Sequence, residues 1–181
     1  SAQVGVIGLG YVGLPLAMEF IRAGFKVTGI DIDKSKVKQL NKGQNYIQDV
    51  ANDDLKAAVK SGQFHATADF SVLSGLDAVS ICVPTPLNKQ KNPDISYINN
   101  VMSQLATFIH PDMLIILEST TYPGTTRELI LPKLEAEGFT VGKDFWLCFS
   151  PERIDPGNKQ FKTANTPKVL GGITDKCTQH G

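Results

Sequence analysis

The sequence predicts an α/β fold built on a doubly wound parallel sheet, and two observations support this prediction. Short apolar runs alternate with stretches whose apolar residues recur at helical spacing, from residue 4 to residue 149. A glycine-rich motif directly follows the first apolar run. Strands and helices that alternate in this way form a parallel sheet with helices on its faces. The length of 181 residues, 41% of them hydrophobic, suits one folded domain.

The glycine-rich motif is Gly8-Leu9-Gly10-Tyr11-Val12-Gly13, after a first strand predicted over 4–7. Each glycine meets a separate steric demand: Gly8 permits a tight turn, Gly10 lets the backbone approach a pyrophosphate, and Gly13 permits close packing of helix on strand. The following helix points its free N–H groups at the phosphates. An ordinary flexible turn is the alternative, because sixteen glycines sometimes reach this spacing by chance. The flanking strand and helix favour a dinucleotide site.

The next two elements strengthen that interpretation. A helix is predicted over 15–23, with Pro15 in its first turn and Gly24 as its stop, and a second strand over 26–30 ends at Asp31. A carboxylate at this position accepts hydrogen bonds from an adenosine ribose and repels a 2′-phosphate, which favours NAD over NADP. Lys34 and Lys36 complicate the choice, since a cation can rescue a phosphate. A solvated helix face explains these lysines equally simply.

The remaining elements continue the alternation. Asp94 is a candidate cap for a helix with apolar residues at helical spacing, and a continuous apolar run at 113–117 is typical of a strand buried on both faces. Helices are predicted over 33–43, 52–62, 94–109 and 124–137, with a further helix starting at 174–175. Strands are predicted over 64–67, 78–83, 113–117 and 145–149. The chain shows no internal repeat.

Composition excludes several classes of function. Lysine and arginine equal aspartate and glutamate, at 18 each, so net charge gives no case for nucleic acid or an anionic membrane. Cys82, Cys148 and Cys177 are widely spaced, which indicates reduced thiols in a cytosolic protein and no zinc or other metal site. Glu19 and Arg22 interrupt the apolar N-terminus, which argues against a signal peptide and a membrane span. We expect a cytoplasmic protein.

Ligands of a doubly wound sheet bind outside the carboxyl ends of its strands, so the loops there are expected to carry the function. Three of these loops combine prolines with hydroxyl or charged residues. They are Val83-Pro84-Thr85-Pro86, the run from Glu118 to Thr125, and the run from Ser150 to Gly157.

Each loop offers candidate residues with a structural alternative. Thr85 either contacts a ligand or bonds its own backbone in a proline turn. Thr120 either contacts a ligand or caps a helix. Glu152 follows the sixth strand, where general bases and water-positioning groups lie, although an ion-paired surface role is the alternative. Arg153 either meets an anionic or carbonyl-bearing substrate or neutralises Glu152 or Asp155.

With these loops identified, the chain resembles the N-terminal portion of the UDP-glucose/GDP-mannose dehydrogenase family of nucleotide-sugar 6-dehydrogenases. Four motifs match in order across essentially the whole chain: Gly8-Leu9-Gly10-Tyr11-Val12-Gly13-Leu14-Pro15, Val83-Pro84-Thr85-Pro86, Ser119-Thr120 with Pro123-Gly124-Thr125, and Ser150-Pro151-Glu152-Arg153. Four motifs in register are far more specific than the glycines alone. The resemblance implies a Rossmann NAD-binding domain that spans 1–181.

The resemblance also implies an activity, that of an NAD-dependent UDP-sugar 6-dehydrogenase. Such an oxidoreductase of nucleotide-sugar metabolism converts a sugar C6 alcohol, through an aldehyde and an enzyme thioester, to a uronic acid for polysaccharide biosynthesis, and it reduces two NAD in turn. The implied cofactor-binding residues are Gly8, Gly10, Tyr11, Val12, Gly13, Asp31, Lys36, Val83, Pro84, Thr85, Ser119 and Thr120. Thr120 and Glu152 are implied to place the catalytic water and its proton transfers. The implied substrate-binding residues are Glu152, Arg153, Ile154, Asp155 and Pro156.

Two departures from the family pattern shape the expectation. The UDP-glucose branch carries a second glutamate where this chain has Pro156, and residues 150–157 are similar to the branch that acts on 2-acetamido sugars, such as UDP-N-acetylglucosamine 6-dehydrogenase. We therefore place UDP-N-acetylglucosamine first, with UDP-N-acetylmannosamine and UDP-glucose behind it.

The second departure concerns parts of the family pattern that lie beyond Gly181. These are the nucleophilic cysteine with its lysine and asparagine partners, the central dimerising helix and the C-terminal domain. None of Cys82, Cys148 and Cys177 matches that nucleophile. We expect a fragment that binds NAD without turnover, taken from an enzyme that forms a homodimer or a larger homo-oligomer.

Two other functions stay open at this point. A β-hydroxyacid dehydrogenase shares a similar glycine motif and transfers a single hydride to NAD, but it does not explain the Ser-Pro-Glu-Arg run. A non-catalytic dinucleotide-binding module, such as a regulatory domain, is the other alternative.

Overall fold

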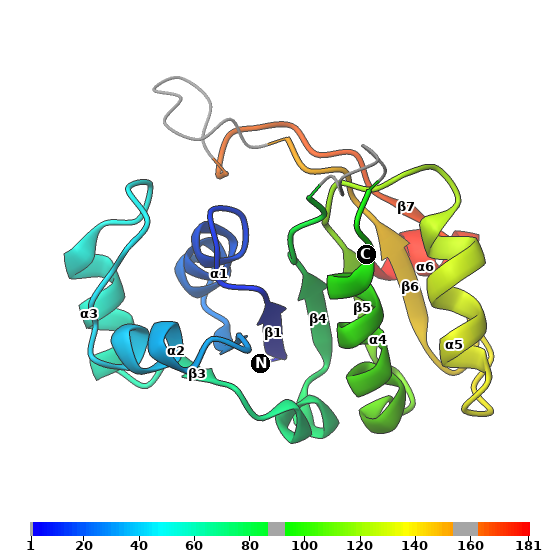
Figure 1. Ribbon diagram of the computed structural model, residues 1–181, viewed down its shortest axis with the longest axis horizontal. Coiled ribbons are helices and arrows are strands. Elements are labelled where there is room, and N and C mark those ends of the chain that lie inside the picture. Colours follow the sequence, from blue (N-terminus) through cyan, green and yellow to red (C-terminus); the bar gives the residue numbers. More distant parts are fainter. Residues whose placement is uncertain (1, 87–92, 154–162) are drawn as a thin grey trace.

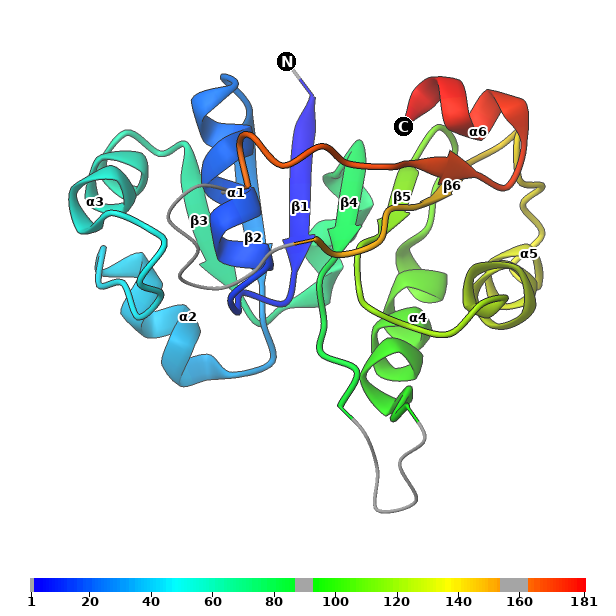
Figure 2. The same cartoon turned by 90° about the horizontal axis from the view of Figure 1, so that it is seen from above.

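The computed structural model describes residues 2–86, 93–153 and 163–181. Within this part, seven strands form one sheet in the order β3-β2-β1-β4-β5-β6-β7 (Figures 1 and 2). The strands are β1 (Gln3–Ile7), β2 (Lys26–Ile30), β3 (Phe64–Thr67), β4 (Ala78–Ile81), β5 (Leu114–Leu117), β6 (Trp146–Phe149) and β7 (Gly171–Gly172). The pairs among β1–β6 are parallel, and β7 lies antiparallel to β6. The predicted doubly wound Rossmann sheet is confirmed.

The helices divide between the two faces of the sheet. They are α1 (Gly13–Arg22), α2 (Lys34–Asn41), α3 (Asn52–Lys60), α4 (Ser96–Phe108), α5 (Leu131–Glu135) and α6 (Asp175–His180), with a 3-10 helix η1 (Phe70–Gly75) and a π-helix η2 (Thr125–Ile130). Buried side chains of α4 and α5 share one apolar cluster, and those of α1, α2 and α3 share another. Alternate residues of β1 reach both clusters: Val4 and Val6 pack with α1, while Ile7 packs with α4.

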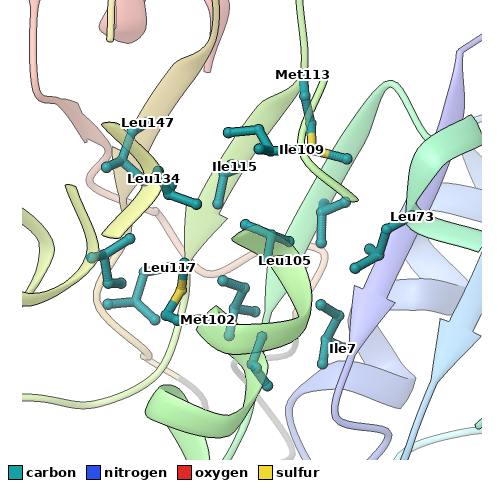
Figure 3. Close-up of a cluster of buried hydrophobic side chains, with 14 of the residues drawn as sticks. Ile7, Leu73, Met102, Leu105, Ile109, Met113, Ile115, Leu117, Leu134 and Leu147 are labelled. Atoms are coloured by element: carbon teal, nitrogen blue, oxygen red, sulfur yellow. The ribbon is translucent and has the colours of Figure 1, made fainter. Parts of the chain in front are cut away.

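The larger apolar cluster lies between α4 and strands β1, β4, β5 and β6 (Figure 3). Its α4 members are Ile98, Val101, Met102 and Leu105, four of the five residues whose spacing predicted this helix. The fifth, Ile109, is also buried but follows the end of the helix. The predicted cap at Asp94 is wrong, because the N-cap position of α4 is Ile95 and α4 has no side-chain cap; Asp94 lies one residue earlier and accepts a hydrogen bond from the Ser96 backbone N–H at 2.9 Å.

Three predicted elements differ in detail. The helix predicted over 124–137 is a π-helix followed by α5, because Pro132 lacks the N–H that an uninterrupted α-helix requires. The strand predicted over 78–83 ends at Ile81. In the run 113–117, Leu114 and Ile116 are only partly buried and pack beside Cys177 of α6. Neither β7 nor η1 had a sequence signal that we recognised.

No helix within the described ranges is long and apolar enough to cross a membrane.

The core position of Leu105 gives a test of the fold. Leu105→Ala removes a fully buried side chain from the α4 cluster, and we expect it to lower the free energy of unfolding by about 2–5 kcal/mol. Urea denaturation followed by circular dichroism measures this change. The exposed neighbour Gln104 is the control: Gln104→Ala should change stability by about 0.5 kcal/mol or less. Equal effects of the two substitutions would contradict the assigned face of α4.

Candidate functional site

A cleft of about 1150 Å³ opens at the carboxyl ends of the strands. It lies where the strand order reverses between β1 and β4, the position at which doubly wound sheets bind ligands. Its lining comes from the glycine motif, from the end of β2, and from the loops that follow β4, β5 and β6. The fold thus brings four of the predicted motifs to one cavity, although they are spread over more than a hundred residues of sequence.

The three glycines of the motif have distinct surroundings. Gly8 has a φ of +90°, and a Cβ atom there would lie 2.7 Å from the Cys82 carbonyl oxygen. A Cβ atom at Gly13 would lie 1.8 Å from the carbonyl oxygen of Gly8. Both glycines are therefore required by the packing of the chain on itself. A Cβ atom at Gly10 would meet nothing within 4 Å, so the open space beside this residue is available to a ligand.

Helix α1 begins directly at this loop. Its N-cap, Val12, provides no side-chain hydrogen bond, and the first turn contains no acidic residue. The partial positive charge of the helix N-terminus is therefore not neutralised by a side chain of its own first turn. Such an end suits the phosphate groups of a ligand that lies in the cleft.

Asp31 connects the end of β2 to the glycine motif. Its carboxylate accepts hydrogen bonds from the backbone N–H groups of Leu9 and Asp33, each at 2.9 Å, and the residue is only 9% exposed. A carboxylate oxygen can accept more than one hydrogen bond, so Asp31 keeps capacity for a ligand hydroxyl. It also lines the cleft, as do Asp33 and Lys36. The residue thus fixes the loop and faces the cavity.

Tyr46 is a contributor that the sequence did not reveal. Its hydroxyl donates to the Leu9 carbonyl oxygen at 2.6 Å, and the Lys36 ammonium group lies 5.9 Å from the centre of its ring. Burial raises the pKa of Tyr46 strongly, and the nearby charges of Asp31 and Asp33 raise it further, so the hydroxyl stays protonated and keeps donating. The loop between α2 and α3 carries no motif, and only the tertiary structure returns it to Leu9.

Hydrogen bonds join the loops after β4 and β5 to each other. Ser119 Oγ donates to the Val83 carbonyl oxygen at 2.7 Å, and Thr85 Oγ1 donates to the Thr120 carbonyl oxygen. The Thr85 hydroxyl therefore bonds the neighbouring loop rather than its own turn. Thr120 caps no helix, because η2 begins after Gly124 and has no side-chain cap. The cleft is lined in this region by Val83, Pro84, Thr85, Ser119 and Thr120.

An ion pair beside the loops after β4 and β5 is a second feature that the sequence did not reveal. Glu118, the first residue after β5, is paired with Lys168. Ser80 Oγ donates to the other carboxylate oxygen at 3.4 Å. Glu118 lines the cleft and is almost fully buried. Fifty residues separate the two partners, and nothing in the sequence pairs them.

The loop after β6 brings Glu152 into the same cavity. Glu152 Oε1 accepts a hydrogen bond from the Arg153 backbone N–H at 2.7 Å. Glu152 lines the cleft, whereas the described Arg153 is exposed and is not among the lining residues. Three predicted substrate residues, Ile154, Asp155 and Pro156, lie outside the described residues.

The three cysteines are free and buried. Burial raises the pKa of Cys82 well above its usual range, and burial together with nearby Cys177 raises that of Cys148 to about 11. A thiol acts as a nucleophile through its thiolate, so these environments suppress reactivity. Among the described residues, no group of three or more His, Cys, Asp or Glu side chains is placed to hold a metal ion.

Comparison with known proteins agrees with this geometry. The model of the NAD binding domain of the UDP-glucose/GDP-mannose dehydrogenase family matches residues 2–181. CapL of Staphylococcus aureus is 38% identical over 96% of the chain and 40% of its own length. UDP-N-acetyl-D-glucosamine 6-dehydrogenase of Salmonella typhi is 34% identical over 99% of the chain and 41% of its own length.

A solved structure is similarly close. The UDP-N-acetyl-mannosamine dehydrogenase Cap5O of Staphylococcus aureus superposes with a TM-score of 0.91 at 30% identity, over 99% of this chain and 43% of that one. The chain spans about two-fifths of the length of these relatives. The match over its whole described length, together with the glycine-lined cleft, shows that the chain belongs to the UDP-glucose/GDP-mannose dehydrogenase family and forms its NAD-binding domain.

Proposed function

We propose that this domain serves a UDP-sugar 6-dehydrogenase that oxidises the C6 alcohol of a UDP-N-acetylhexosamine to a uronic acid for polysaccharide biosynthesis. The observation that carries the proposal is one cleft that joins the glycine motif and Asp31 to Thr120 and Glu152. A cofactor held by the first pair of features places its reactive end near the second. The family membership argues against a β-hydroxyacid dehydrogenase and against a non-catalytic dinucleotide-binding module.

Asp31 and Lys36 are proposed to hold the adenosine ribose. Asp31 faces the cleft with acceptor capacity to spare, and Lys36 lies on the same side, in the first turn of α2. The carboxylate repels a 2′-phosphate, which supports NAD rather than NADP. The backbone at Gly10, Tyr11, Val12 and the end of α1 then faces the pyrophosphate. Gly8 and Gly13 act by allowing this approach.

The loops after β4 and β5 are proposed to hold the nicotinamide half. The Ser119 hydroxyl donates to the Val83 carbonyl and the Thr85 hydroxyl donates to the Thr120 carbonyl. These two hydrogen bonds fix the loops that line this part of the site. Thr120 and Glu152 are proposed to help place the catalytic water and its proton transfers. Bound NAD supplies the hydride acceptor for each of the two oxidations. The position of Glu152 in the same cavity supports its action on a proton near the sugar C6.

The substrate is proposed to be UDP-N-acetylglucosamine first, with UDP-N-acetylmannosamine and UDP-glucose behind it. Relatives similar to this chain carry names that specify dehydrogenation of UDP-N-acetyl sugars. Glu152 and Arg153, with Ile154, Asp155 and Pro156, are proposed to contact it. The complete enzyme is proposed to be a homodimer or a larger homo-oligomer of the cytoplasm.

The chain by itself is proposed to bind NAD without turnover. The thioester route requires an activated thiolate. Cys82, Cys148 and Cys177 are all buried, and the first two have raised pKa values. None of these thiols supplies that nucleophile.

Asp31 gives a test of cofactor choice. Asp31→Asn removes the charge but keeps one acceptor oxygen, so the loop contact to Leu9 can survive while the ribose loses a charge-assisted hydrogen bond. We expect NAD affinity to fall by about tenfold, which corresponds to ~1.4 kcal/mol, and the ratio of NADP to NAD affinity to rise. Isothermal titration calorimetry measures both. Asp53→Asn, an exposed carboxylate of α3, should leave both affinities unchanged.

Turnover is tested with the chain as it stands. Mixed with NAD and a panel of UDP-sugars, it should give no sustained absorbance of NADH at neutral pH. At a hundred times the dissociation constant, NAD should nevertheless stabilise the fold by about 2.7 kcal/mol, measured as a rise in melting temperature. Sustained NADH production would show that one of the described cysteines, or another route, completes the reaction.

Calorimetry with UDP-sugars separates the dehydrogenase from a simple nucleotide module. Added affinity for a UDP-sugar in the presence of NAD supports the proposed function. Binding of adenine nucleotides without any preference for a UDP-sugar would favour a non-catalytic module instead.

A further inference from the structure

The ion pair between Glu118 and Lys168 is a charged feature of the cleft that the proposed chemistry has not used. The side chain of Glu118 is 5% exposed and that of Lys168 is 28% exposed. Glu118 is held in place by its position after β5, by the backbone hydrogen bond from its N–H to Ile81, and by the hydroxyl of Ser80. The Lys168 ammonium group is the charged partner of this deeply buried carboxylate.

The pair has a definite orientation relative to the cavity. Glu118 is among the residues that line the cleft, whereas Lys168 is not. The carboxylate end of the pair therefore faces the cavity. Because the adenosine side of such a site is marked by Asp31 after β2, the loops after β4 and β5 face the nicotinamide side. Glu118 thus presents its carboxylate to the nicotinamide half of the cleft.

The charges of this region act on a neighbouring side chain. The pKa of the Cys82 thiol, which also lines the cleft, is raised by burial first. Glu118 and Glu152 raise this pKa further, and Lys168 lowers it. The charges of both partners therefore act on a side chain that lines the cavity.

We propose that Glu118, paired with Lys168, is a specificity-determining residue that makes the site prefer oxidised NAD over NADH. The oxidised nicotinamide ring carries a positive charge and the reduced ring is neutral, so a facing carboxylate stabilises only the former. The proposal rests on the placement of NAD given above. A reaction that uses two NAD in turn gains from this preference, because NADH leaves the site before the second NAD enters.

The test measures how one substitution changes the affinities for three ligands, NAD, NADH and ADP-ribose. Glu118→Gln removes the carboxylate charge with little change of shape and leaves Lys168 free to turn towards solvent. We expect the affinity for NAD to fall by about five- to tenfold, as expected for one charge acting across several ångströms at intermediate dielectric. Affinities for NADH, and for ADP-ribose, which lacks the nicotinamide, should stay within about twofold by the same reasoning. Calorimetry and NADH fluorescence give the three values.

Two further variants make the result decisive. Glu137→Gln makes the same charge change at an exposed position of the chain and should move none of the three affinities. The double substitution Glu118→Gln with Lys168→Met leaves no unpaired buried charge. Its ratio of NAD to NADH affinity should lie between those of the unsubstituted chain and Glu118→Gln, because the positive charge is also gone. If Glu118→Gln fails to fold, the double variant alone tests the proposal. Its ratio of NAD to NADH affinity should then be lower than that of the unsubstituted chain.

Each outcome has a distinct meaning. Equal weakening of NAD, NADH and ADP-ribose would show that the pair only supports the structure, and unchanged affinities would show that it does not face the ring; either overturns the proposal. Failure of the unsubstituted chain to bind ADP-ribose or NAD would instead contradict the proposed placement of the cofactor itself.

Discussion

Among the glycines that the structure describes, Gly13 leaves the least room for a side chain, because a Cβ atom there would lie only 1.8 Å from the carbonyl oxygen of Gly8. This close approach brings the start of α1 directly against the end of β1. Gly8 in turn lies against the backbone of Cys82, so β1, α1 and the end of β4 meet at one point. The position of the helix N-terminus, and hence of any bound phosphate, depends on this approach. The rest of the cleft is arranged around it.

Around this point the chain places charges at two separate ends of the cavity. Asp31 and Asp33 lie at one end, where Asp31 also fixes the loop through Leu9. Glu118, paired with Lys168, lies at the other end. Strands β1 and β4 lie between β2 and β5 in the sheet, so the strand order separates Asp31 from Glu118.

The loops that carry function are stabilised by bonds to one another rather than by their own turns. Ser119 and Thr85 each donate a hydroxyl proton to a carbonyl of the neighbouring loop. Tyr46 does the same for the glycine loop, from a segment with no recognisable motif. A wall built in this way orients its backbone before any ligand arrives, which lowers the entropic cost of binding.

The amino-acid sequence by itself determined the alternation of strands β1–β6 with helices, the glycine loop and the position of Asp31 at the end of β2. Each of these depends on local rules: apolar periodicity, the freedom of glycine and the position of an acid after a strand. The strands over 26–30 and 64–67 agree with the structure residue for residue. The helix predicted over 124–137 was wrong in detail although the sequence contains the reason, because Pro132 lacks the backbone N–H that an uninterrupted α-helix requires.

Only the tertiary structure decided which distant residues contact the residues of the cleft. Tyr46 reaches Leu9 across thirty-seven residues, and Lys168 reaches Glu118 across fifty. Neither partner has a spacing or a motif that marks it, because such contacts arise from the crossing of distant segments over one sheet. The sequence therefore indicated several of the residues that line the cleft, such as Asp31, Thr85 and Glu152, while the fold decided the hydrogen-bond and ion-pair partners of the lining residues.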